Sequence, residues 1–115
     1  MNVNYDGKVF RGRSNTPNGE VDGSTLFHYH QADGVLTGTY SGGSVVTGQL
    51  LGHVHTDGRL EFHYHHLNTA GALMAGKCRS VPREENGRLV LQERWQWLTG
   101  DQSSGESEVE EVLER

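Results

Sequence analysis

Short turn signals divide this chain into segments of strand length, and that spacing limits what it can fold into. Asp33-Gly34, Asp57-Gly58 and Asn86-Gly87 each supply residues that tolerate a positive φ angle, as tight β-hairpin turns require. The segments between them are rich in aromatic and β-branched residues and show no sustained helical period of apolar positions. The sequence therefore predicts hairpins that pair consecutive strands.

Eight strands follow from this pattern, and the 115 residues fit one all-β domain that spans residues 1–115. An open sheet of eight strands would leave two edges unpaired and one face uncovered. We therefore expect a single antiparallel up-and-down meander closed into a barrel, with a two-sheet sandwich as the alternative. The long connections at 15–23 and 99–105 are expected at the barrel rim. The expected strands are Lys8–Ser14, Ser24–Gln31, Val35–Tyr40, Ser44–His55, Leu60–Asn68, Ala72–Val81, Arg88–Leu98 and Glu106–Leu113.

Side-chain alternation across the hairpins predicts which residues face the barrel interior. The strand Arg88–Leu98 sets the reference, because one of its faces carries two tryptophans and is otherwise mostly apolar. A two-residue turn at Asn86-Gly87 then sets Trp95 opposite Cys78, a large side chain against a small one, as small barrels are filled. Propagated through the other hairpins, this reasoning predicts an inner aromatic and polar band made of Tyr29, Tyr40, Tyr64, His66, Asn68, Glu93, Trp95, Trp97, Ser107 and Glu111.

The faces of the strand Ser44–His55 depend on the length of its two flanking loops. Three-residue loops at 41–43 and 56–58 would turn Val46, Gly48, Leu50, Gly52 and Val54 inward. A two-residue turn at Asp57-Gly58 would instead turn His53 and His55 inward, because a one-residue slip exchanges the two faces.

Seven histidines raise the question of a metal site. Each of the pairs His28/His30, His53/His55 and His63/His65 shares one face of a strand. A two-residue turn at Asp33-Gly34 puts the first pair on the outer face, and three-residue loops at 69–71 and 56–58 do the same for His63/His65 and His53/His55, away from an enclosed cleft. We therefore predict no metal site, and no cofactor. The single cysteine, Cys78, excludes an intrachain disulfide and is expected to be an inert buried thiol beside Trp95.

The inner band has three interpretations. In the first, a small-molecule binder, Trp95, Trp97, Tyr40 and Tyr64 form the walls, while Glu93, His66, Asn68 and Ser107 orient the ligand by hydrogen bonds. In the second, a small enzyme, Glu93 and His66 act as an acid/base pair. In the third, the barrel is filled by its own side chains and serves as an oligomerisation or interaction module. We prefer the first and lean away from an enzyme.

Net charge and hydropathy limit which classes of partner this protein can bind. The net charge of −5 and the acidic C-terminal segment argue against a nucleic-acid groove or an anionic membrane surface. No stretch approaches the ~20 apolar residues of a membrane span, and residues 1–8 lack the apolar core of an export signal, so we expect a cytoplasmic protein. An outer aliphatic patch would suit a homodimer; its residues are Val45, Thr47, Leu51, Leu73 and Ala75.

Several motifs resemble those of a family of short bacterial proteins, over nearly the whole chain. They include Phe27-His28-Tyr29, Thr39–Gly43, Gly76-Lys77-Cys78 and Glu93–Trp97. Members are often labelled N-acetylglutamate synthase, an activity of mixed α/β proteins with a pyrophosphate loop that opens a helix, and no such helix is readable here. In addition, Thr37–Tyr40 and Trp95–Gly100 are similar to strand endings of avidin and lipocalin-like (calycin-like) barrels; in avidin, tryptophans line a biotin pocket. This likeness implies a barrel that binds a small molecule.

Overall fold

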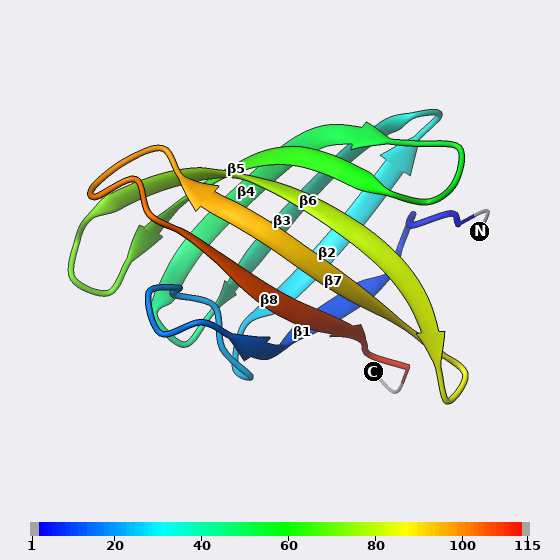
Figure 1. Cartoon of the computed structure of the whole chain (residues 1–115), viewed down its shortest axis with the longest axis horizontal. Helices are drawn as coiled ribbons and strands as arrows, with labels where there is room; N and C mark the ends of the chain where they lie inside the picture. The colour runs from blue at the N-terminus through cyan, green and yellow to red at the C-terminus, as the bar shows by residue number, and fades with distance from the viewer. Residues whose placement is uncertain (1–2, 114–115) are drawn as a thin grey trace.

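A computed structural model describes residues 3–113, which form a closed antiparallel barrel of eight strands (Figure 1). Each strand pairs with the next one along the chain, and β8 pairs with β1 to close the barrel. The predicted meander is therefore confirmed, and the two-sheet alternative is wrong. The strands are β1 (Val9–Asn15), β2 (Leu26–Ala32), β3 (Val35–Gly42), β4 (Val45–Val54), β5 (Leu60–Asn68), β6 (Leu73–Glu85), β7 (Arg88–Trp97) and β8 (Ser104–Glu111). Among residues 3–113, no helix is long and apolar enough to cross a membrane.

The turn between β6 and β7 has the expected form. Asn86 and Gly87 both have positive φ angles, 53° and 78°, as a two-residue turn of the primed type requires. Glu85 pairs with Arg88 across it. This register places Trp95 opposite Cys78, as predicted. The turn chemistry at the tip therefore determines which side chains meet in the interior, several residues away.

The loop between β4 and β5 is the three-residue form. The N–H of His55 donates to the carbonyl of Arg59 at 2.8 Å, and Gly58 takes a φ of 90°. This register leaves His53 on the outer face opposite Glu61. His55 is half-buried at the loop. The other strand histidines outside the band, His28, His30, His63 and His65, are exposed.

The start of β4 differs from the sequence prediction. Val45 is 2% exposed and faces the interior, whereas Val46 is 51% exposed and faces outward. The connection before it is shorter than expected, because Gly42 pairs directly with Val45. β4 then carries one extra residue just after Val45, a bulge that shifts the register with both neighbouring strands and so offsets the shorter connection. Gly48 and the inward positions that follow it therefore keep the predicted face, while the expected outer patch loses Val45.

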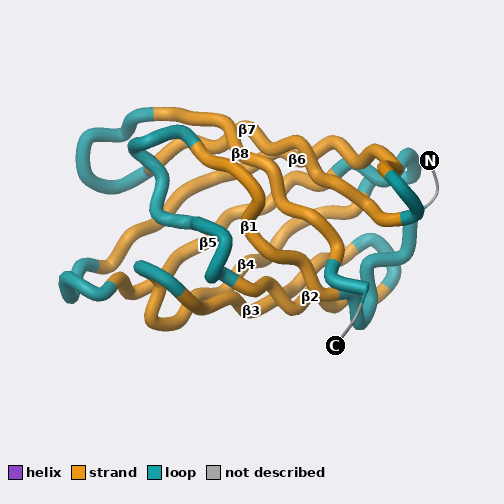
Figure 2. Tube along the Cα trace, turned by 90° about the horizontal axis from the view of Figure 1, so that it is seen from below, coloured by secondary structure: helices purple, strands orange, loops and turns teal. Residues whose placement is uncertain are grey.

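Loops lie at both ends of the barrel (Figure 2). At one end, Tyr5 is fully buried, and its hydroxyl donates to the carbonyl of Gly58 at 2.6 Å. It packs beside Phe10 and Tyr29. At the other end, the loop 16–25 between β1 and β2 folds back against the inner tryptophans. Six residues of the inner band line a cavity beside this loop.

Candidate ligand-binding site

Aromatic side chains form the wall of the barrel near the loop 16–25. The rings of Trp95 and Trp97 lie 5.4 Å apart, and Tyr64 meets Trp97 edge to face at 5.9 Å. Three of the large rings pack over a glycine on a neighbouring strand: Tyr40 over Gly48, Tyr64 over Gly76 and Trp95 over Gly105. A Cβ added to Gly48 would lie 2.5 Å from the ring of Tyr40. The alternation of small and large residues therefore brings the rings close to the backbone opposite them.

The base of this region holds a buried carboxyl group. Glu93 on β7 is 7% exposed and accepts hydrogen bonds from the hydroxyls of Ser80 and Ser107, each at 3.0 Å. Burial raises the pKa of Glu93, and the hydrogen bonds from Ser107 and Ser80 oppose that rise. Burial also raises the pKa of the neighbouring Cys78 thiol, so this sulfur stays protonated and weakly nucleophilic.

A second polar group lies at the mouth of the barrel. Nδ1 of His66 is 2.8 Å from the hydroxyl of Tyr40, and Nε2 is 2.7 Å from the carboxylate of Glu20. Asn68 donates to the same carboxylate at 3.1 Å. In a neutral imidazole, the arrangement that satisfies all partners has Nε2–H donating to Glu20 and the Tyr40 hydroxyl donating to Nδ1. Burial raises the pKa of Tyr40, so the phenol keeps its proton.

The loop 16–25 and the end of β1 each bond one of the two tryptophans at the mouth. The indole N–H of Trp97 donates to the carbonyl of Asn18 at 3.0 Å, and that of Trp95 donates to the side chain of Asn15, at the end of β1, at 3.1 Å. This loop was expected at the rim, but Glu20 was not expected in the site. The sequence held only an indirect signal for it, which the prediction did not use: His66 and Asn68 on an inner face need an acceptor, and a long polar loop with one glutamate follows β1.

The family model described as avidin-like protein matches residues 3–112. The chain belongs to the avidin-like family. No curated protein and no solved structure matches it. The likeness to avidin barrels in the sequence is therefore supported at the level of the family, whereas the N-acetylglutamate synthase label receives no support from these comparisons.

The avidin-like barrel holds a half-open cavity of about 40 Å³ beside the loop, room for roughly three water molecules. Six of the predicted band residues line it: Tyr40, Tyr64, Glu93, Trp95, Trp97 and Ser107. The loop and the end of β1 add Asn15, Gly19, Glu20 and Val21. The interior is thus mostly filled in this closed form, and part of the filling comes from the loop.

Four other predicted residues stand apart from the cavity lining. His66 and Asn68 meet at the mouth through Glu20. Tyr29 packs deeper, 5.0 Å from the ring of Phe10, and among residues 3–113 its hydroxyl has no hydrogen-bond partner. Glu111 pairs with Lys8 at 3.0 Å and also accepts the backbone N–H of Leu89. Along β8, Val109 lies between Ser107 and Glu111. Glu111 is therefore farther along the strand than the band and does not join it.

Glu93 and His66 belong to separate hydrogen-bonded groups. Glu93 bonds serines of β6 and β8, whereas His66 bonds Tyr40 and Glu20. No hydrogen bond joins Glu93 to His66 within residues 3–113. A reaction that used both would need a substrate or water between them.

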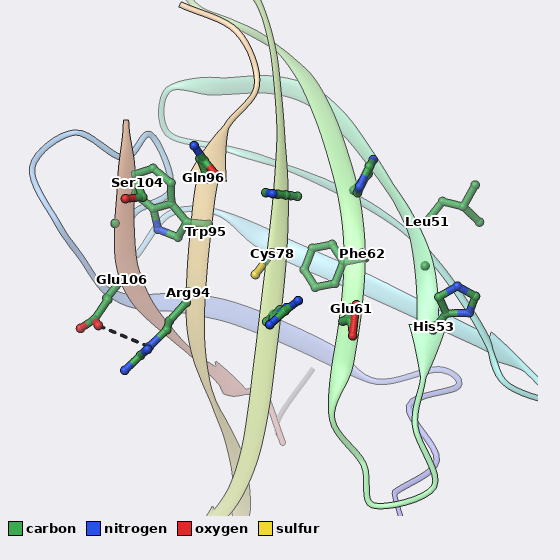
Figure 3. A pocket seen from close by; sticks show the side chains of 15 residues that line it. Leu51, His53, Glu61, Phe62, Cys78, Arg94, Trp95, Gln96, Ser104 and Glu106 are labelled. Atoms are coloured by element: carbon green, nitrogen blue, oxygen red, sulfur yellow. Dashed lines mark ion pairs between the residues drawn. The ribbon is translucent and has the colours of Figure 1, made fainter. Parts of the chain in front are cut away.

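The outside of the barrel carries a wider groove that is open to solvent. It measures about 980 Å³ and lies across β4 to β8 (Figure 3). Outward side chains give it mixed charge: Lys77, Arg79 and Arg94 against Glu61 and Glu106. Arg94 pairs with Glu106 at 3.6 Å. Within the described residues, no cluster of three or more His, Cys, Asp or Glu side chains is arranged to hold a metal ion.

Proposed function

We propose that this protein binds a small molecule in the mouth of its barrel, between the tryptophans and Tyr40 and Tyr64. One observation supports this above the others: the aromatic cavity, which a buried carboxyl group also lines, is bordered on one side by a loop and not by the barrel wall alone. Aromatic walls with a few fixed polar groups are typical of small-molecule sites. Membership of the avidin-like family supports the same class of function.

Binding requires the loop 16–25 to move. Sites for drug-sized ligands typically measure 300–1,000 Å³, far more than the roughly 40 Å³ that is free under the closed loop. Val21 of the loop packs against the core, and polar contacts tie the loop to the barrel mouth, among them the indole bond to Asn18 and the bonds from His66 and Asn68 to Glu20. Such contacts can be exchanged for ligand contacts without disturbing the strands.

The small cavity favours one competing function. A barrel that fills its own interior could act as an interaction module, and exposed Leu51 and Leu73 on the outer wall would suit a second copy of the chain. The two functions predict opposite results in one experiment, because only a binder responds to small molecules through its inner tryptophans.

The test is a tryptophan-fluorescence and thermal-shift screen of a metabolite library that includes biotin. Both tryptophans of the chain line the cavity, so emission reports on its occupancy. A ligand at 100 times its Kd should raise the free energy of unfolding by about 2.7 kcal/mol. Trp97→Phe should weaken the response, while the outer-face control Leu51→Ala should leave it unchanged. If no compound shifts either emission or Tm, the binding function is refuted and the interaction module is favoured.

A further inference from the structure

We propose that the ligand is a carboxylate with a short apolar body, and that its carboxylate takes the place now held by the side chain of Glu20. This inference rests on the proposed binding function and specifies its ligand class. In the closed barrel, the carboxylate of Glu20 accepts hydrogen bonds from His66 and Asn68 on the barrel wall. Glu20 thereby acts as an internal competitor for the site.

The two donors are oriented by the barrel and not by Glu20. The side-chain oxygen of Asn68 accepts the N–H groups of Ala70 and Ala72 at 3.1 and 2.9 Å, which turns its amide nitrogen toward the mouth. The ring of His66 is held by Tyr40 on its other side. Both N–H groups converge on one carboxylate, because Oε1 of Glu20 lies 2.7 Å from His66 and 3.3 Å from Asn68. The site for a carboxylate therefore persists when the loop leaves.

When the loop opens, the N–H groups of His66 and Asn68 lose Glu20 and need another hydrogen-bond acceptor. His66 is 2% exposed and Asn68 is 8% exposed, so withdrawal of Glu20 beneath a bound ligand would leave two buried donors without a partner. An unpaired buried donor is costly, and hydrogen bonds to a charged acceptor are the stronger kind. An alkylammonium group offers no acceptor, and a neutral amide offers only an uncharged one. A carboxylate accepts from both donors, as Glu20 does.

The apolar body of the ligand follows from the surfaces beside Glu20. Phe27, Leu50, Phe62 and Tyr64 line the cavity adjoining this carboxylate, together with Trp97. Its free volume of about 40 Å³ grows only by what the loop vacates. This limits the body to a short chain or a single ring, and hexanoate is a suitable probe.

The experiment compares hexanoate, hexanamide and hexylammonium, titrated by calorimetry into the wild type, Glu20→Ala and Glu20→Gln. Glu20→Gln keeps the shape of the loop if Glu20→Ala perturbs it. Exposed Glu84→Ala is the control that removes one carboxylate far from the mouth. Because the internal competitor is gone, Glu20→Ala should bind hexanoate about tenfold more tightly than the wild type, a gain of the size of one charge-assisted hydrogen bond. Hexanamide should gain much less, and Asn68→Ala added to Glu20→Ala should cancel the gain.

The possible results test the carboxylate subsite separately from the proposed binding function. If hexanamide binds as tightly as hexanoate, or if Glu20→Ala gives both the same gain, the carboxylate subsite is refuted while the binding function stands. If hexanoate fails to bind Glu20→Ala and Glu20→Gln, the subsite is also refuted, and the metabolite screen alone then decides the binding function. A gain for hexanoate in the Glu84→Ala control would refute the role of Glu20 as competitor.

Discussion

Replacing Glu93 by glutamine should abolish a loss of stability that the wild type suffers as pH rises. The carboxyl group of Glu93 is buried among Ser80, Ser107 and Cys78, and burial raises its pKa above the ordinary value of 4.5. Glutamine has nearly the same shape and can bond both serine hydroxyls, since each hydroxyl donates or accepts. The substitution thus removes the titration and keeps the packing.

The sign and size follow from proton linkage. The folded-state pKa of Glu93 lies above the unfolded one, so between these two values the folded protein binds more protons than the unfolded chain. The free energy of unfolding then falls with rising pH, by up to about 1.4 kcal/mol per pH unit. The effect is absent below the unfolded pKa and levels off above the folded pKa. The stability of Glu93→Gln minus that of the wild type should therefore grow from pH 4 upward.

Urea unfolding at pH 4, 5, 6 and 7, followed by tryptophan emission, measures this difference. Exposed Glu84→Gln removes the same formal charge from the outer surface and supplies the baseline. A difference between Glu93→Gln and the wild type that stays flat across this range, after subtraction of the baseline, would refute the argument that burial dominates the titration of Glu93. Equal m-values in both proteins establish that the comparison is between like states.

Three further predictions concern packing and burial. Tyr5→Phe should lower the free energy of unfolding by about 1 kcal/mol, because a buried hydrogen bond is lost. Tyr29→Phe should be near neutral, because its hydroxyl has no partner among the described residues. Equal losses for the two variants in denaturant titrations would contradict this. Cys78 should resist a thiol reagent in the native protein and react in urea, since burial raises its pKa, and fast native labelling would contradict that burial. Gly48→Ala should destabilise by about 1–3 kcal/mol, since its methyl group would meet the ring of Tyr40; an unchanged Tm would show that the ring moves aside freely.

The closed barrel and most of its inner face could be predicted from the sequence, because local turn chemistry sets register and register sets faces. Asn86-Gly87 and Gly58 adopt the positive φ angles that their residue types favour. The first turn places Trp95 on the predicted side, and the second selects the three-residue alternative, which leaves His53 outside. A two-residue periodicity then extends each local choice along the whole strand. Errors stay small as long as no strand contains an extra residue.

The parts that could not be predicted depend on contacts between distant segments. The bulge that turns Val46 outward leaves no residue-type signature, because valine suits either face. Glu20 reaches His66 across 46 positions of sequence, so its place is set by how the loop closes over a barrel that must already exist. The same holds for Glu111, whose partner Lys8 comes from the other end of the chain.

The chain of hydrogen bonds from Glu20 through His66 to Tyr40 resembles an acid/base relay, but its environment suits recognition better than reaction. A relay that activates a nucleophile must make the proton of that nucleophile easier to remove. Burial here raises the pKa of Tyr40 and so makes removal harder. These hydrogen bonds do orient the imidazole ring, since Tyr40 bonds Nδ1 and leaves Nε2 toward Glu20 at the mouth. A wall that presents fixed donors to whatever replaces Glu20 gains selectivity for an acceptor, because any ligand that lacks one leaves those donors buried and unpaired.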